Sequence, residues 1–142
     1  MTISRSDSVL IVPVEPEGKA RPRFDSRSRR TYTPTKTIKY EWTIREAWQN
    51  HFPGRPPLVG DVDVQIIARF RMPSSWSRKK RTETLLTPCR KKPDTDNIAK
   101  AVLDALNGLA YVDDAQVVRL HVSKVWGLVG AVEIRISEVR NE

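Results

Sequence analysis

Three aspartates and one lysine surround a short amphipathic segment, and their spacing suggests chemistry. Asp94 and Asp96 lie at the start of an expected helix, Lys100 lies one turn inside it, and Asp114 follows its end. If the helix packs so that its two flanking loops meet, the three carboxylates converge. Crowded carboxylates repel one another and raise their pKa values, whereas a hard divalent cation relieves this repulsion and prefers oxygen ligands. The pattern predicts a metal site formed by Asp94, Asp96 and Asp114.

A site of this kind suits the hydrolysis of a phosphodiester. Mg²⁺ takes a few protein carboxylates and completes its shell with water and substrate phosphate oxygens, and Mn²⁺ is a plausible substitute. A bound ion lowers the pKa of a water molecule and neutralises charge on the leaving oxygen. Lys100 can steady the water or the negative charge of the transition state. The sequence therefore nominates Asp94, Asp96, Lys100 and Asp114 as catalytic residues.

These residues also have ordinary structural explanations. Acidic side chains are common at helix starts, where backbone N–H groups and the helix dipole favour negative charge. Lys100 can form an i,i+4 pair with Asp96, worth only tenths of a kcal/mol. Asn97 and Asp104 are candidates for supporting positions around the site, but a solvated helix face or a local hydrogen bond is the simpler explanation for them. The metal site is favoured by the whole set of residues, not by any single one.

The charge of the chain favours a nucleic-acid partner. Among 142 residues, 25 Lys and Arg against 17 Asp and Glu give a net charge of +8, although such a charge also suits anionic membranes. The length fits one domain, covering residues 1–142. Without a membrane-spanning apolar run, a secretion signal or a second cysteine beside Cys89, we expect a cytoplasmic protein. No glycine-rich phosphate loop is present, so no nucleotide cofactor is expected.

Two basic stretches are candidates for gripping a phosphate backbone. One is an N-terminal loop or hairpin at about residues 18–33, and the other is a flap at about residues 73–93 that leads into Asp94. Tyr32 and Trp76 can stack on unpaired bases, although anchoring their loops to the core is the simpler explanation. The side chains expected to bind phosphates are Lys19, Arg21, Arg23, Arg78, Lys79, Lys80, Arg81, Lys91 and Lys92.

Helix and strand patterns in the first half of the chain are clear. The β-branched residues 8–14 end in a proline-containing stretch and predict an edge or first strand. Ile38, Trp42, Ala47 and Trp48 recur near helical spacing and predict a helix over residues 35–50. Partial alternation over residues 62–70 predicts a strand with one buried face. The flap that follows is either a functional loop or contains a short helix capped by Ser74 or Ser75.

The second half predicts one more helix and two strands. The helix has an apolar stripe at Ile98, Val102, Ala105, Leu106 and Leu109, with Asp94 or Thr95 as its cap and Asn107-Gly108 at its end. Residues 117–126 and 129–136 alternate around two glycines, which is typical of a hairpin. This order of elements predicts a single-domain α+β fold, with two main helices packed on one face of a mixed sheet.

Several motifs closely resemble the RusA family of Holliday-junction resolvases from phages and prophages. They are KPDTDNIAK at 92–100, LDALNG at 103–108 and VDDAQV at 112–117, supported upstream by GKARPR at 18–23 and YTP at 32–34. The resemblance implies a homodimeric, Mg²⁺-dependent endonuclease that makes paired symmetric nicks in four-way DNA junctions during recombination and repair. It also implies that Asp94, Asp96 and Asp114 bind the metal and that Lys100 is catalytic, with Asp113 as a further acid in a supporting role.

The sequence also suggests two alternative functions. The second hypothesis is a non-catalytic module that binds junctions or RNA, in which the acids only cap a helix. The third is a nuclease that cuts flaps, replication forks or RNA. A rise in melting temperature on adding Mg²⁺ would separate the metal site from simple capping, because only binding to the folded state stabilises it.

Overall fold

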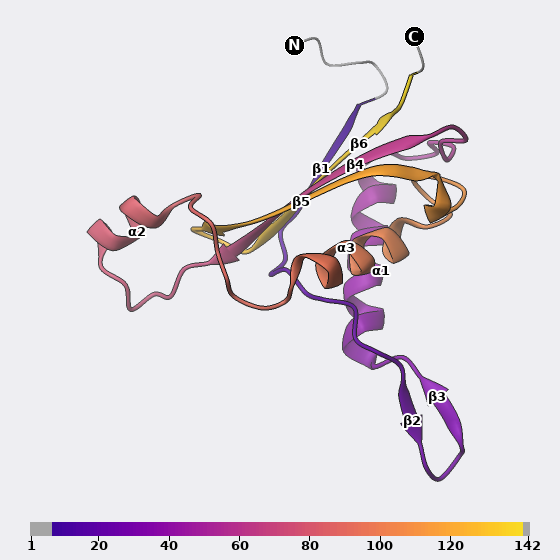
Figure 1. Ribbon diagram of the computed structural model, residues 1–142, viewed down its shortest axis with the longest axis horizontal. Helices are drawn as coiled ribbons and strands as arrows, with labels where there is room; N and C mark the ends of the chain where they lie inside the picture. The colour runs from indigo at the N-terminus through magenta and orange to yellow at the C-terminus, as the bar shows by residue number, and fades with distance from the viewer. Residues whose placement is uncertain (1–6, 141–142) are drawn as a thin grey trace.

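A mixed sheet of four strands forms the centre of the protein (Figure 1), whose structure is a computed structural model describing residues 7–140. The strands lie in the order β1-β6-β4-β5. β6 runs antiparallel to β1 and β4, whereas β5 runs parallel to β4. Their bounds are β1 (Ser8–Val12), β4 (Val62–Arg71), β5 (Val117–Gly127) and β6 (Ala131–Glu138).

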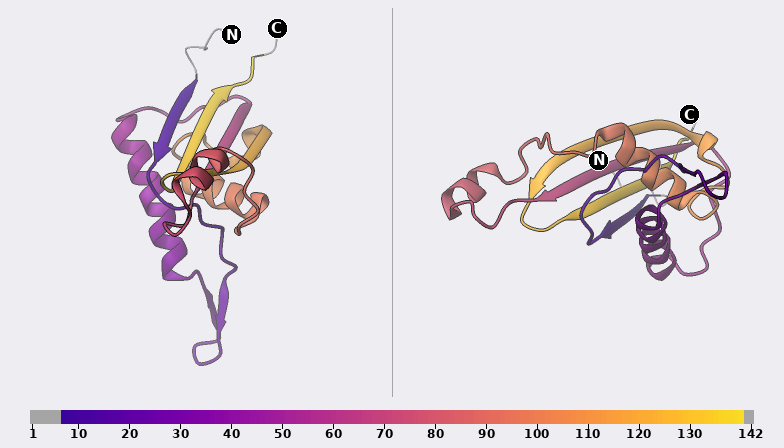
Figure 2. Two further views of the ribbon diagram at one scale, coloured as in Figure 1. Left: turned by 90° about the vertical axis from the view of Figure 1, so that its left-hand side faces the viewer. Right: turned by 90° about the horizontal axis from the view of Figure 1, so that it is seen from below.

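Two long helices, α1 (Thr35–His51) and α3 (Thr95–Leu106), pack against each other and against one face of the sheet (Figure 2). Four positions of the predicted apolar stripe, Ile98, Val102, Ala105 and Leu106, lie on α3 with no exposed area. Leu109, the fifth, lies beyond the end of the helix and is half-buried against the core. Burying this stripe stabilises the helix in its place on the sheet, because isolated helices of this length are marginal in water. The predicted α+β fold, with two main helices on one face of a mixed sheet, is confirmed.

Two smaller elements project from this body (Figure 1). The strands β2 (Arg23–Asp25) and β3 (Arg30–Tyr32) form a separate hairpin, which was one of the two predicted forms of the N-terminal basic stretch. The flap contains the short helix α2 (Arg78–Thr84). Among residues 7–140, no helix is long and apolar enough to cross a membrane.

The predicted cap of α2 was wrong by two or three residues. Ser77, and not Ser74 or Ser75, caps the helix, since its hydroxyl oxygen accepts a hydrogen bond from the Lys80 N–H at 3.1 Å. The two earlier serines lie in a separate turn, closed by a bond from the Trp76 N–H to the Pro73 carbonyl. Three serines within four positions have the same capping propensity, so the sequence alone does not distinguish them. The turn places the first two outside the helix start.

The prediction of a hairpin at the C-terminus was also wrong. β5 and β6 are consecutive in the chain, but β4 lies between them in the sheet. Because β5 runs parallel to β4, the chain must cross over the sheet between these two strands, and α3 belongs to that crossover. A Cβ at Gly127 would lie 3.0 Å from the Val129 carbonyl oxygen and 3.2 Å from the Arg69 Cβ. The absence of a side chain at Gly127 therefore lets the connection from β5 to β6 pass close to β4. In the sequence this connection resembles a hairpin turn.

The helix predicted over residues 35–50 is confirmed as α1, but only part of its predicted apolar spacing is buried. Trp48 is buried and Ala47 is half-buried against the core, whereas Ile38 and Trp42 are 55% and 61% exposed. The other buried positions are Thr37, Tyr40 and Ile44, which together with Trp48 follow helical spacing. Two of them are a threonine and a tyrosine, so choosing only the most apolar residues of the segment misses part of the buried face.

Candidate active site

The start of α3 carries the first pair of acids. Asp94 is the residue before the first turn, its backbone is extended, and its carbonyl oxygen accepts a hydrogen bond from the Ile98 N–H at 3.0 Å. Its side chain makes no capping hydrogen bond. Asp96 follows in the first turn, and both residues are exposed to solvent. Both carboxylates therefore remain accessible to a ligand, and a capping bond does not account for Asp94.

Beyond α3, Tyr111 anchors the loop that carries the remaining acids. Tyr111 is fully buried, and its hydroxyl donates a hydrogen bond to the Leu103 carbonyl oxygen at 2.7 Å. The loop then enters a 3₁₀ turn, η1 (Asp114–Gln116). These contacts fold the chain back onto α3, so that Asp113 and Asp114 return towards the helix they follow.

Gln116 fixes the same loop from the other side. Its Nε2 donates to the carbonyl oxygens of Leu58 and Gly60, both at 2.8 Å, and its Oε1 accepts from the Asp113 N–H at 2.9 Å. All three bonds join the side-chain amide to backbone groups. Because they use both its donor and its acceptor, the amide has little freedom to rotate. One bond within the turn and two to a distant segment therefore hold the loop that carries Asp113 and Asp114.

Four charged groups meet around this loop. A side-chain hydrogen bond with Asp113 raises the pKa of Asp114 above its usual range, helped by partial desolvation and by the charges of Asp113 and Asp104, while Lys100 opposes the change. Lys100 Nζ lies 3.8 Å from Asp104 Oδ2. The i,i+4 partner of Lys100 is thus Asp104, on the next turn of α3, where the sequence suggested Asp96. The structure brings Lys100, Asp104, Asp113 and Asp114 into one cluster.

The two acids at the helix start lie outside this cluster. Asp94 and Asp96 are not among the groups that shift the pKa of Asp114. Across residues 7–140, no three carboxylate, imidazole or thiol side chains are close enough to hold one ion. The donor chemistry nevertheless fits a hard cation, because Asp94, Asp96 and Asp114 are all solvent-exposed carboxylates and the raised pKa of Asp114 reflects crowding that a cation would relieve.

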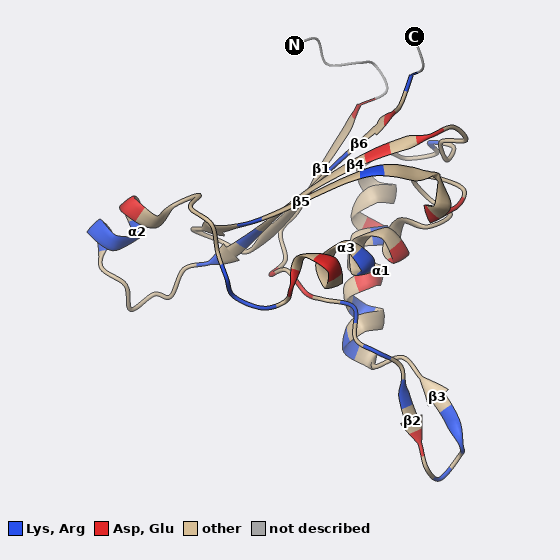
Figure 3. Ribbon diagram, in the orientation of Figure 1, with Lys and Arg blue, Asp and Glu red and all other residues tan. Residues whose placement is uncertain are grey.

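A basic groove adjoins Asp94. It has a volume of about 550 Å³ and lies between the N-terminal segment, the start of α1 and the start of α3. Arg23, Lys36 and Lys92 line it together with Glu17, Asp94 and Asn97, and Lys36 Nζ lies 3.7 Å from Glu17 Oε1. Figure 3 shows basic residues continuing from here onto the β2–β3 hairpin, while acidic residues mark both ends of α3. The groove can receive a phosphate-bearing ligand directly beside Asp94.

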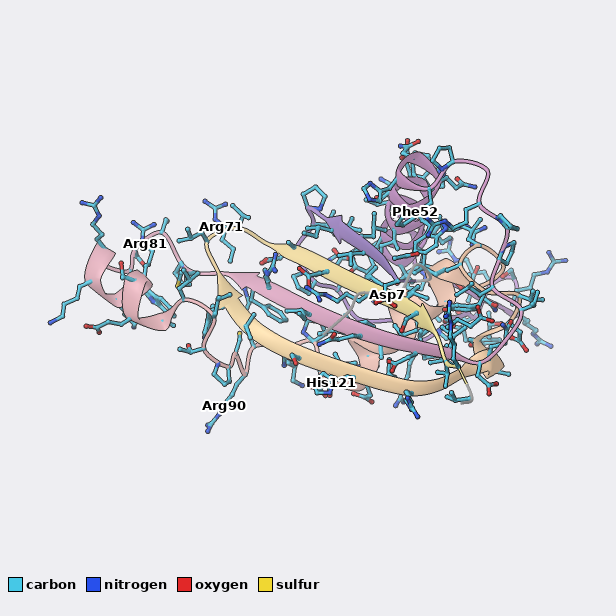
Figure 4. The ribbon with its side chains drawn as sticks, turned by 90° about the horizontal axis from the view of Figure 1, so that it is seen from above. Asp7, Phe52, Arg71, Arg81, Arg90 and His121 are labelled. Carbon is cyan, nitrogen blue, oxygen red and sulfur yellow. The ribbon has the colours of Figure 1, made fainter. Side chains whose placement is uncertain are left out.

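The flap presents a second basic surface, far from the groove along the sheet. Arg78, Lys79, Lys80 and Arg81 lie on α2, and Figure 4 shows Arg81 and Arg90 directed away from the sheet. Trp76 anchors this flap to β5, since the centres of the Trp76 and Trp126 rings are 5.0 Å apart. The Lys80 ammonium lies 4.1 Å from the centre of the Trp76 ring. Anchoring therefore accounts for the position of Trp76. Lys91 and Lys92 are exposed on the segment that returns to α3.

Lys19, a predicted phosphate-binding residue, is occupied within the protein. Its ammonium forms ion pairs with Glu41 and with Asp104, and its side chain is only 20% exposed. By contrast, Arg21 and Arg23 in the same basic stretch are exposed. The basic stretch thus divides into an inward-facing lysine and outward-facing arginines.

Sequence reasoning missed several residues that position the site. Tyr111, Gln116 and Glu41 were not singled out, and neither was Arg45. The Arg45 guanidinium donates to the carbonyl oxygens of Ala105 at 2.9 Å and Asn107 at 3.2 Å, which satisfies groups at the C-terminal end of α3. Only Gln116 carried a local signal, because an amide two residues after adjacent aspartates can cap their turn.

Comparisons with known proteins show the family of this chain. The family profile described as endodeoxyribonuclease RusA matches residues 13–137. A relative from Bacillus subtilis (strain 168), described as uncharacterized protein YqaN, is 36% identical over 132 residues, covering 88% of this chain and 92% of the relative. The matched span includes both basic stretches, the whole of α3 and the loop with Asp113 and Asp114. The chain belongs to the RusA family of crossover-junction endodeoxyribonucleases.

Proposed function

We propose that this endodeoxyribonuclease resolves four-way DNA junctions by paired symmetric nicks, acts as a homodimer and depends on Mg²⁺. One observation carries the proposal: α3 presents exposed carboxylates at its start and in the loop after its end, with Lys100 between them, beside a groove lined by Arg23, Lys36 and Lys92. Basic side chains draw the phosphodiester towards the acids, and the acids provide oxygen ligands.

The residues of the site then have distinct roles. Asp94, Asp96 and Asp114 would hold the ion, which when bound supplies an activated water and neutralises charge on the leaving oxygen. Lys100 is 64% exposed and only loosely paired with Asp104, so its ammonium is available to contact a phosphate oxygen in the transition state. Asn97 on α3, with Asp104 and Asp113, would support this arrangement without contacting the ion.

Binding of DNA uses different residues from the chemistry. We assign binding of the DNA phosphates to the exposed basic side chains of the two projecting elements and of the segment leading to Asp94. They are Arg21, Arg23, Arg78, Lys79, Lys80, Arg81, Lys91 and Lys92. Because such contacts release counterions from DNA, affinity falls steeply with salt.

A dimer supplies the second cut. A four-way junction has approximate two-fold symmetry, and two copies of one site related by a two-fold axis can cut opposed strands. The substrate is then recombining or repaired DNA in the cytoplasm of a bacterial host, where the single buried Cys89 remains reduced.

A junction-cleavage assay tests the proposal. Synthetic four-way junctions, flaps, replication forks and linear duplexes are incubated with the protein in Mg²⁺, and again with a chelator. We expect symmetric nicks in opposed strands of the four-way junction, only with the cation. Preferential cutting of flaps or forks, or binding without cleavage in Mg²⁺, would reject this function in favour of another branched substrate or of a binding module.

A further inference from the structure

We propose that Lys19 is a positioning residue: by neutralising Asp104 it keeps the Lys100 ammonium available to the substrate. This inference rests on the proposed function of Lys100. It assigns Lys19, which the sequence places among the phosphate-binding residues, to the interior of the catalytic site, and it brings Glu41 into the site as well.

Both lysines lie near a single carboxylate oxygen. Asp104 Oδ2 is 3.3 Å from Lys19 Nζ and 3.8 Å from Lys100 Nζ. The Lys19 and Asp104 side chains are 20% and 25% exposed, whereas Lys100 is 64% exposed. The partly buried pair is less screened by water, so its attraction is stronger than that of the outer pair. Lys19 is thus the principal partner of Asp104, and Lys100 is the secondary one.

The segment containing Lys19 is fixed against the start of α3. The Lys19 N–H donates to the Asn97 carbonyl oxygen at 3.1 Å. A Cβ at Gly18 would lie 3.0 Å from the Cβ atoms of both Asn97 and Pro93. Glu41, on α1, forms a second ion pair with the Lys19 ammonium. These contacts hold the lysine inward, so that reaching the DNA would require breaking two ion pairs.

Removing the Lys19 charge has a definite electrostatic consequence. Asp104 would lose its nearest cation, and Lys100, at i,i+4 spacing on the same helix, would become its remaining partner. Tighter pairing with Asp104 would draw the Lys100 ammonium away from the phosphate.

This role differs measurably from a DNA contact. A phosphate-binding lysine contributes to junction affinity and to its salt dependence. A positioning lysine acts on the rate of cleavage of bound DNA and leaves both of those quantities unchanged. It also has a specific suppressor, because removing the charge of Asp104 removes the reason for neutralising it.

The test measures single-turnover cleavage at saturating enzyme, together with junction affinity at several salt concentrations, for Lys19→Met, Asp104→Asn and the double variant. Lys19→Met should lower the cleavage rate about tenfold at unchanged affinity and unchanged salt slope. Adding Asp104→Asn should restore most of the lost rate, as a coupled pair requires. Lys39→Met, which changes an exposed lysine on the same helix as Glu41, is the matched control and should behave as wild type.

Each other outcome is decisive. A wild-type rate for Lys19→Met, or a loss that Asp104→Asn does not relieve, overturns the inference, and a lower affinity with a smaller salt slope identifies a DNA contact instead. If Lys19→Met does not fold, the double variant carries the test: a rate close to wild type supports the inference, and a tenfold loss overturns it. A wild-type protein that cuts no branched DNA overturns the proposed function, whereas normal wild-type cleavage beside an equally active Lys19→Met overturns only this inference.

Discussion

The Tyr111 hydroxyl donates a hydrogen bond to the Leu103 carbonyl oxygen at 2.7 Å, which ties the loop after α3 to the last turns of the helix itself. The bond is local in sequence, and it acts together with the Gln116 bonds to Leu58 and Gly60 to hold the loop that carries Asp113 and Asp114. The site is therefore formed by a helix together with its own returning loop.

Removing this bond should affect both stability and cleavage. Tyr111→Phe keeps the buried ring and deletes only the donor, so we expect a loss of about 1 kcal/mol in the free energy of unfolding and a several-fold lower cleavage rate. Urea unfolding measures the first quantity and single-turnover cleavage the second. Tyr32→Phe, at a half-exposed position, is the control and should leave stability unchanged. Equal stability of Tyr111→Phe and wild type would show that the bond does not hold the loop.

Asp114→Asn should abolish cleavage without weakening the fold. Asp113 raises the pKa of Asp114, so the folded state disfavours the charged form. This cost is absent below the pKa of the unfolded chain, grows as pH rises through the folded value, and is fully present at pH 7. Neutral asparagine removes the cost, so the melting temperature at pH 7 without divalent ions should equal or slightly exceed that of wild type. A clear fall in melting temperature under these conditions would contradict the crowding of the acids.

The ion pairs of Lys19 give a separate prediction at alkaline pH. Burial alone would lower the pKa of Lys19, but hydrogen bonds and charge interactions with Glu41 and Asp104 outweigh it and raise the pKa. A raised lysine pKa contributes stability that is fully present below the unfolded value of about 10.4 and is lost as pH rises through the folded value. The stability difference between wild type and Lys19→Met should therefore shrink above that pH. A stability difference between the two proteins that stays constant from pH 8 to the most alkaline buffer would refute the ion-pair role of Lys19.

The basic surface of α2 should contribute to binding and not to chemistry. Replacing Arg78 and Lys79 together by glutamine should weaken junction affinity for all sequences alike and lower the salt slope by about 2, because each phosphate contact contributes about one unit. The cleavage rate at saturating protein should stay the same. Fluorescence anisotropy across a salt series measures the slope. An unchanged slope would mean that this helix does not touch DNA.

Much of the fold was predictable because its signals are local. The strand β4 was predictable from the alternation at Val62–Phe70, and the helix α3 from the apolar stripe at Ile98–Leu106. Both patterns lie within one segment of the chain and do not depend on its partners in the fold. The pairing of strands is a nonlocal property. The insertion of β4 between β5 and β6 depends on the parallel crossover through α3, and nothing in the alternation of residues 117–136 distinguishes it from a hairpin.

The candidate site divides in the same way. The acids and Lys100 could be nominated from residue type and spacing alone, and the family resemblance gave them roles. The partners of Lys19 could not be predicted, because Glu41 lies 22 residues away on α1 and Asp104 lies on α3. A basic stretch indicates net charge, but only the packing of α1 against α3 shows which of its lysines faces inward.

Binding of Mn²⁺ to the protein, followed by electron paramagnetic resonance in the presence of an uncleavable four-way junction, tests the central claim most directly. The claim is that Asp94, at the start of α3, and Asp114, beyond its end, hold the same ion. We expect Asp94→Asn and Asp114→Asn each to abolish the same binding event, with the double variant no worse than either single one. Wild-type Mn²⁺ affinity in either single variant would contradict the account.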